Sequence, residues 1–214
     1  MTVSFMPCCR KCSESMERIR TSVTLFVLSI CILLLIAMPV WAEGVEIKSV
    51  RFSAINAGYE VSVDSEITLN PTLEQALEKG VVLYFVTKFS LIDSRWYWLS
   101  DEVARGKMRV GLRYYALTRQ FLLNYPSQSQ SFNTLAEALQ ALGQLRDFPL
   151  VVKSELRTDV DYHASLRIWL DLTRMPKPFQ VEALGSSKWD FSSEKLEWQM
   201  KLPMPGQPFQ IKAH

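Results

Sequence analysis

Cysteine is absent from most of this 214-residue sequence, because its four cysteines all lie within the first 31 positions: Cys8, Cys9, Cys12 and Cys31. Residues 43–214 therefore have no thiol for a disulfide, a nucleophile or a metal thiolate. The cluster CCRKC at residues 8–12 has no second ligand cluster at zinc spacing, so we expect no metal site. A region of this length buries roughly 70 per cent of its unfolded surface, enough to be held by a hydrophobic core alone.

Excess charge and reactive side chains are also scarce after residue 42. Residues 43–214 contain 20 Lys and Arg against 20 Asp and Glu, and their only histidines are His163 and His214. A chain without net positive charge is not typical of nucleic-acid binding, so we expect no nucleic-acid partner. The sequence has no G-x-S-x-G elbow, phosphate-binding loop or H-E-x-x-H helix, so we expect no cofactor and favour a non-enzymatic function.

One long apolar run lies near the start, VTLFVLSICILLLIAM at residues 23–38. Arg18 and Arg20 precede it and the short segment PVWA, ending in the small residue Ala42, follows it, an order that predicts a secretory signal peptide over residues 1–42, cleaved after Ala42. A more typical leader would begin at Met16, which is therefore an alternative start. We expect a periplasmic protein. The alternative is an uncleaved anchor in the inner membrane, facing the periplasm, because the run approaches the roughly 20 residues that a spanning helix needs.

Alternating apolar and polar residues predict several β-strands. YEVSVDSEITLN, residues 59–70, has a period of two and should form an amino-terminal hairpin with VEIKSVRF, residues 45–52. VVLYFVTKFSL, residues 81–91, is apolar on both faces, which is typical of a central strand. TDVDYHASLRIWLDLT, residues 158–173, alternates throughout, and EKLEWQMKL, residues 194–202, predicts the last strand.

The stretch RWYWLSDEVARGKMRVGLRYYALTR, residues 95–119, is unusually rich in aromatic and basic residues. Its alternation places Met108, Val110 and Leu112 on an apolar face, and we expect a strand that pairs as a hairpin with RWYWL. On one interpretation the opposite face is structural, with Arg stacked on Tyr. On the other it binds a partner, and the candidate partner-binding residues are Trp96, Arg109, Arg113 and Tyr115.

Two short helices should cover the sheets. NPTLEQALEKG, residues 70–80, has a capping residue at Asn70, and TLAEALQALGQLR, residues 134–146, begins with a capping box. A polar loop, YPSQSQSFN, precedes the second helix. Residues 175–190, MPKPFQVEALGSSKWD, form a proline-bounded excursion in which one helical turn is expected before Gly185. Within it, PKPFQ predicts a rigid extended crossover between two sheets anchored by Phe179 and Val181, or alternatively a preformed recognition loop.

These elements predict a mainly β (α+β) fold. We expect an antiparallel β-sandwich of six to eight strands with two short covering helices, formed by a single β-rich domain over residues 43–214. No internal repeat or linker divides this region.

A weak polar site is the one candidate for chemistry. Asp161 and His163 share a strand face, where side chains two residues apart lie about 6.5–7 Å from each other, close enough for a base and its orienting group or for two metal ligands. Charged residues on the wet face of a strand are common, so we assign no catalytic, cofactor-binding or metal residues.

Several blocks of the sequence resemble a known family. They are QALEKGVVLYFV, SRWYWLSDE, LRYYALTRQF, TLAEALQALGQL, YHASLRIWLDLTRMPKPFQVEAL and KWDFSSEKLEW. In this order they are similar to the proteobacterial family of exported proteins called domain of unknown function 4390, with Met175 where a Leu is expected. The resemblance implies export, no established activity and no assigned catalytic residues. It also implies a genetic context near a membrane sensor kinase.

Together these observations favour a non-enzymatic periplasmic or membrane-associated accessory module that binds an envelope partner, with a sensor kinase or another inner-membrane protein as the expected partner. The leader would contact the membrane if it is not cleaved. The alternatives are a hydrolase of envelope polymers centred on Asp161 and His163, and an assembly factor that pairs with a client by strand addition.

Overall fold

The computed structural model describes residues 43–55, 58–94, 100–153, 156–158, 160–203 and 208–212. These residues belong to a compact unit that spans Ala42–His214. They form eleven β-strands and three α-helices, and every strand pair is antiparallel. Within the described part of the chain, no helix is long and apolar enough to cross a membrane. The predicted leader lies outside the described residues.

The first sheet has four strands in the order β11-β1-β2-β7. Its central hairpin is the predicted one, and the strands are β1 (Gly44–Ile55), β2 (Gly58–Thr68), β7 (Gln144–Pro149) and β11 (Phe209–Lys212). Inward side chains of β1 and β2, such as Phe52 and Val63, are almost fully buried. The period of two in the sequence therefore marks a buried face and a wet face.

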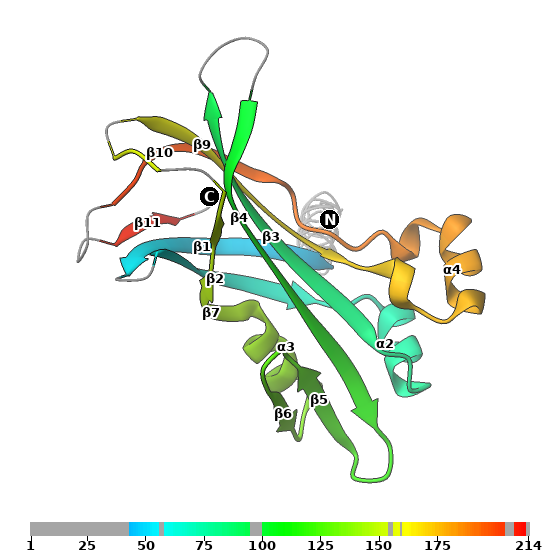
Figure 1. The fold of residues 1–214 in the computed structure, drawn as a ribbon. Helices are drawn as coiled ribbons and strands as arrows, with labels where there is room; N and C mark the ends of the chain where they lie inside the picture. Colours follow the sequence, from blue (N-terminus) through cyan, green and yellow to red (C-terminus); the bar gives the residue numbers. More distant parts are fainter. Residues whose placement is uncertain are drawn as a thin grey trace, which may run out of the picture. The chain divides into compact units, whose positions relative to one another are not determined.

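The second sheet has seven strands, six of them in the order β10-β9-β3-β4-β5-β6. They are β3 (Leu83–Ser94), β4 (Ser100–Tyr115), β5 (Gln120–Asn124), β6 (Ser129–Phe132), β9 (Asp161–Leu170) and β10 (Leu196–Lys201). The seventh, β8 (Val151–Val152), pairs with the edge of β4. Figure 1 shows β3 and β4 running side by side as the longest strands of this sheet.

The predicted antiparallel sandwich is confirmed. Inward side chains of both sheets share one core, in which the rings of Phe52 from β1 and Phe89 from β3 lie 5.7 Å apart. The structure has more strands than the six to eight expected. The strands that were not predicted, β5, β6, β7, β8 and β11, are two to six residues long and lack a sustained apolar alternation, so no periodic signal reveals them.

Two of the three α-helices begin where the sequence predicts. Asn70 caps α2 (Pro71–Glu78), its side-chain oxygen accepting from the Leu73 N–H at 2.9 Å. Thr134 and Glu137 form the expected capping box of α3 (Leu135–Gly143). However, α3 ends earlier than expected, because the chain enters β7 at Gln144 and Leu145 packs inward from that strand.

The hairpin partner of β4 is β3, which pairs with it from Leu83↔Leu112 to Ser94↔Ser100. The expected partner RWYWL, residues 95–99, lies outside the described residues. The polar stretch 125–133 was also only partly a loop, because it contains β6.

The segment PKPFQ, expected to be an extended crossover, is instead helical, and the helix before Gly185 is eight residues long rather than one turn. It forms α4 (Lys177–Leu184), with Pro178 in its first turn, where a missing N–H costs nothing. Short 3-10 helices flank it at Leu172–Arg174 and Ser187–Trp189, and it links β9 to β10 within one sheet rather than crossing between sheets. Phe179 packs edge-on against the buried Trp189 at 5.9 Å, but Val181 is 70% exposed and anchors nothing in the core.

Gly143 gives a direct test of how closely α3 packs on the first sheet. A β-carbon at this position would collide with the backbone carbonyl oxygen of Ser65, which cannot rotate away. We expect Gly143→Ala to lower the free energy of unfolding by about 1–3 kcal/mol, measured by urea denaturation. The control is Gly185→Ala after α4, where the new carbon would meet only the Glu182 carbonyl at 3.9 Å. Equal stability of the two variants would contradict the packing described.

Candidate functional site

The register of the seven-stranded sheet places three cations in one row across its outer face. Lys88 on β3 lies directly opposite Lys107 on β4, and on its other side it lies opposite Arg167 on β9. All three side chains are exposed. In adjacent antiparallel strands such directly opposed residues have their β-carbons about 4.5–5.5 Å apart. The outer face of the sheet therefore carries a concentrated positive charge at its centre.

Further cations extend this row along β4. Arg105 lies two residues before Lys107, and Arg109 and Arg113 lie two and six residues after it, so all four side chains share one face of the strand. We call the set of six residues the basic face: Lys88, Arg105, Lys107, Arg109, Arg113 and Arg167.

Few carboxylates neutralise the basic face. Glu102 lies near one end, 3.8 Å from Lys88 and in close contact with Lys153. The hydrogen bond from Lys153 is the main cause that lowers the pKa of Glu102, so Glu102 stays ionised but is shared between two lysines. Within the described residues, Arg105, Lys107 and Arg113 have no carboxylate partner. Like charges directly opposite one another destabilise a sheet, so this arrangement has a cost that the core must offset.

Arg109 is the member of the basic face that is tied into the fold. Its Nη2 donates to Oδ2 of Asp171 at 3.0 Å, and Asp171 also accepts from the hydroxyl and the N–H of Thr173. Burial on its own would raise the pKa of Asp171, but the hydrogen bond from Thr173 and the charge of Arg109 outweigh it and hold the pKa below its ordinary value. Arg109 is therefore chiefly structural.

The predicted partner-binding residues are only partly brought together. Arg113 lies over the ring of Tyr115 at 5.8 Å, and Tyr115 is 37% exposed, so this pair is available at the surface. Arg109 lies on the same face but is turned toward Asp171. Trp96 lies outside the described residues.

The weaker predicted pair lies on the outer face of β9. Asp161 and His163 are both exposed, and their cross-strand neighbours on β10 are Lys201 and Gln199. Among the described residues, no group of three or more His, Cys, Asp or Glu side chains is close enough to hold a metal ion.

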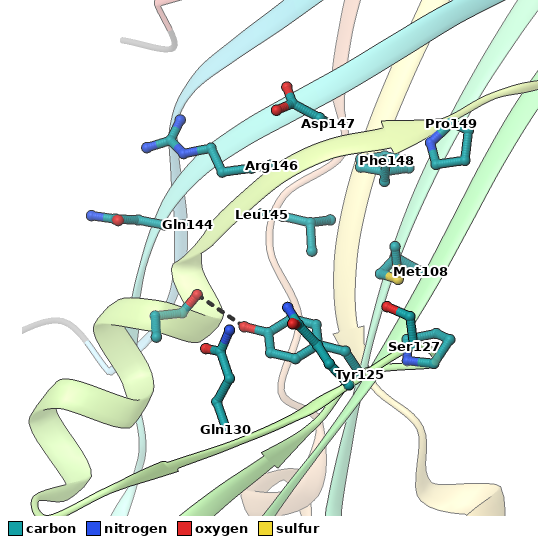
Figure 2. Close-up of a pocket in the computed structure, with 13 residues that line it drawn as sticks. Met108, Tyr125, Ser127, Gln130, Gln144, Leu145, Arg146, Asp147, Phe148 and Pro149 are labelled. Carbon is teal, nitrogen blue, oxygen red and sulfur yellow. Dashed lines mark hydrogen bonds between the residues drawn. The ribbon is translucent and has the colours of Figure 1, made fainter.

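A pocket of about 450 Å³ opens where the two sheets diverge beside α3. Figure 2 shows Met108 of β4 lying between the Phe148–Pro149 end of β7 and Ser127 below. Tyr125 enters from the opposite side, and its hydroxyl donates to the Ala141 carbonyl at 3.3 Å. Burial raises the pKa of Tyr125, so it remains a neutral hydrogen-bond donor. The pocket is therefore lined by both apolar and polar side chains, and the Ala141 carbonyl that it contains is already bonded to Tyr125.

The rim of this pocket is held by a bulge in β7. The register shifts between Val61 and Val63, and Asp147 takes a left-handed conformation with φ of 45°. Ser62 stabilises the bulge by donating to Asp147 Oδ1 at 2.8 Å and by accepting from the Asp147 N–H at 3.1 Å. Arg146 pairs with Asp64 through two hydrogen bonds. The edge of β7 is thus bent and closed to regular strand pairing.

Comparison with known proteins places this fold in a family. A family model described as Domain of unknown function (DUF4390) matches residues 42–199. The chain belongs to the DUF4390 family. No curated protein and no solved structure matches it. The resemblance seen in the sequence blocks is therefore confirmed, and the basic face and the pocket belong to a DUF4390 domain.

Sequence reasoning missed two members of the basic face, Lys88 and Arg167. Each occupies one of the alternate positions that face outward in its own strand, and the sequence does reveal this direction. The sequence does not reveal that β3 lies between β4 and β9, and only this order brings the cations of this DUF4390 domain into one row.

The Arg109–Asp171 pair predicts how stability depends on pH. The pKa of Asp171 is lower in the folded state than its ordinary value of 3.8. The ionised carboxylate therefore makes its full contribution to the free energy of unfolding above pH 3.8, and this contribution is lost as the pH falls through the lower pKa of the folded state. We expect Asp171→Asn to reduce the free energy of unfolding by about 1–3 kcal/mol at neutral pH. Urea denaturation across pH should show this difference shrinking as the pH falls below 3.8 and through the lower pKa of the folded state, because wild-type Asp171 then also becomes neutral.

The control for this prediction is Asp161→Asn, which removes a carboxylate from an exposed position on the same sheet face. It should leave stability nearly unchanged at every pH. A pH-independent difference between Asp171→Asn and the wild type would show that the ion pair is not the cause.

Proposed function

We propose that this DUF4390 domain is a non-catalytic binding module that holds an acidic partner protein against its basic face. The observation that carries the proposal is the row Arg167–Lys88–Lys107, three exposed cations in direct register across three adjacent strands. Such a row opposes folding through mutual repulsion, and carboxylates of a partner would convert the repulsion into attraction.

The distribution of ion pairs supports this role. Among the described residues of the basic face, Arg109 pairs with Asp171 and anchors the strand end there, and Lys88 lies 3.8 Å from Glu102, which Lys153 also contacts. Arg105, Lys107 and Arg113, which have no carboxylate partner within the described residues, can therefore contact a partner without breaking an internal ion pair.

The hydrolase alternative has weaker support. Asp161 and His163 lie on an open, exposed sheet surface rather than in a cleft that would desolvate them. Catalytic acids and bases usually depend on such desolvation to tune their proton affinity. Binding is therefore the better interpretation of this face.

We place the module in the bacterial envelope, periplasmic after cleavage of the leader or tethered by it. The support is the order of basic, apolar and small residues before Ala42, together with a DUF4390 match that begins at residue 42. The partner would then be an envelope protein, such as the outer domain of an inner-membrane sensor kinase.

Charge reversal on the basic face tests the binding proposal. We expect Arg105→Glu combined with Lys107→Glu to weaken binding of poly-L-glutamate about tenfold or more at low salt, because each exposed pair contributes on the order of 0.2–1 kcal/mol and reversal replaces attraction with repulsion. Binding can be followed by fluorescence anisotropy across a salt titration. Neither cation has a carboxylate partner among the described residues, so the melting temperature should not fall.

The matched control is Lys79→Glu combined with Lys177→Glu, which makes the same change in net charge at exposed sites near the ends of α2 and α4. Equal loss of poly-L-glutamate binding in both double variants would show that net charge, rather than the basic face, governs binding.

The proposed export predicts a defined mature terminus. When the full chain is expressed in a Gram-negative host and recovered from the periplasmic fraction, mass spectrometry should identify Glu43 as the first residue. Ala42→Arg should block this processing, because signal peptidase needs a small residue there. Recovery of the intact leader in the membrane fraction would favour the tethered alternative.

A further inference from the structure

The side of β4 that faces away from β3 lacks a strand partner in its middle, although the side chains of Phe148 and Leu150 pack over Gly106. β8 pairs with β4 at Ala104 and Arg105, and β5 pairs with it from Gly111 onward, both on the side opposite β3. Between these two points, over residues 106–110, no described strand pairs with this side of β4. Five residues between these two pairings correspond to about 17 Å of extended chain.

Proline accounts for both ends of the gap. If β8 continued backward in register, Leu150 and Pro149 would face Gly106 and Lys107, but Pro149 has no N–H to donate, and Leu150 instead donates to the Tyr59 carbonyl in the other sheet. If β5 continued forward, Tyr125 and Pro126 would be next. There the chain turns away, with the Tyr125 N–H bonded to the Gln128 carbonyl.

The pocket lies at this gap. Met108, at the centre of the uncovered segment, is one of its walls, and Pro126 and Pro149 are two others. An extended segment placed here would have its side chains on alternate faces. The residue opposite Met108 would enter the pocket beside Phe148, whereas the residues opposite Lys107 and Arg109 would lie on the basic face.

We propose that this gap takes a short acidic segment of a partner protein as an added antiparallel strand, with an apolar residue between two acidic ones. The apolar side chain fills the pocket, and at least one acidic side chain meets Lys107, which has no carboxylate partner within the described residues. This inference rests on the proposed function and deepens it, because it names the form in which the acidic partner binds. Backbone hydrogen bonds supply affinity and the alternation supplies specificity.

The other edges are less suited to this role. β7 is bent by its bulge, β6 and β11 are only four residues long, and the regular edge strand β10 presents Glu197, Gln199 and Lys201 outward instead of a row of cations. Edges that are short or bulged resist strand addition. The gap on β4 lies between β8 and β5. A short segment could therefore pair there, but a long strand of another molecule, as in aggregation, could not.

Three capped peptides test the proposal: Val-Glu-Leu-Glu-Val, a register-shifted Glu-Val-Leu-Val-Glu of the same composition, and the first peptide with N-methyl groups on both Glu residues. By NMR titration we expect the first peptide to bind about tenfold more tightly than either of the others, because only it combines alternation with free backbone donors. Amide exchange should slow within residues 106–110 and at no other edge.

Two variants connect the binding to the pocket. Met108→Ala should weaken the first peptide several-fold by removing its apolar contact, and Leu184→Ala, at a 90% exposed apolar residue on α4, should not. If Met108→Ala does not fold, the comparison of the three peptides on the wild-type protein still tests whether the segment binds as an added strand.

The possible outcomes separate this inference from the proposed function. If poly-L-glutamate binds but the three peptides do not differ, strand addition is wrong and the basic face stands. If neither poly-L-glutamate nor any peptide binds, the proposed function also fails. Preferential binding to phosphatidylglycerol vesicles over the first peptide would overturn both in favour of a membrane surface.

Discussion

The central position of β3 is the constraint on which the rest of the structure depends. It pairs with β4 on one side and with β9 on the other, and through these two ladders it holds the three longest strands of the larger sheet in fixed register. Its inward residues, including Phe85 and Phe89, are almost fully buried between the sheets. The same pairing fixes the outward residues, so the core and the basic face are two consequences of one register.

This coupling explains how the fold tolerates repulsion on its outer face. Val86, the outward neighbour of Lys88 along β3, is completely buried although it faces away from the core, between Arg109 and Trp169 in the cross-strand register. Long side chains can bury their apolar stems on such a residue while their charges stay in water. Apolar packing around Val86 therefore stabilises the outer face, next to the row of Lys88, Lys107 and Arg167, whose mutual repulsion destabilises it.

The sequence reveals faces more readily than neighbours. Alternation is enough to predict the hairpin β1–β2, the long strand β9 and the outward direction of Lys107 and Arg113. It cannot show that β3 separates β4 from β9, because that order depends on contacts between segments far apart in the chain. It also misjudged the segment after Pro176, where two prolines suggested an extended chain but Pro178 instead occupies the first turn of α4. The pocket was beyond prediction, because it arises where β7 and β8 divide their pairing between two sheets.

The two candidate surfaces lie on opposite faces of the same short segment of β4, and this limits what kind of partner could use both. Lys107 points outward with the basic face, and Met108 points inward to the pocket. A flat anionic surface, such as a membrane, could reach Lys107 but not Met108, because the plane of the sheet separates them. An extended chain beside residues 106–110 reaches both, since its own side chains alternate with the same period. Strand geometry therefore favours a polypeptide partner over a surface, for the same reason that alternation in the sequence first indicated a sheet.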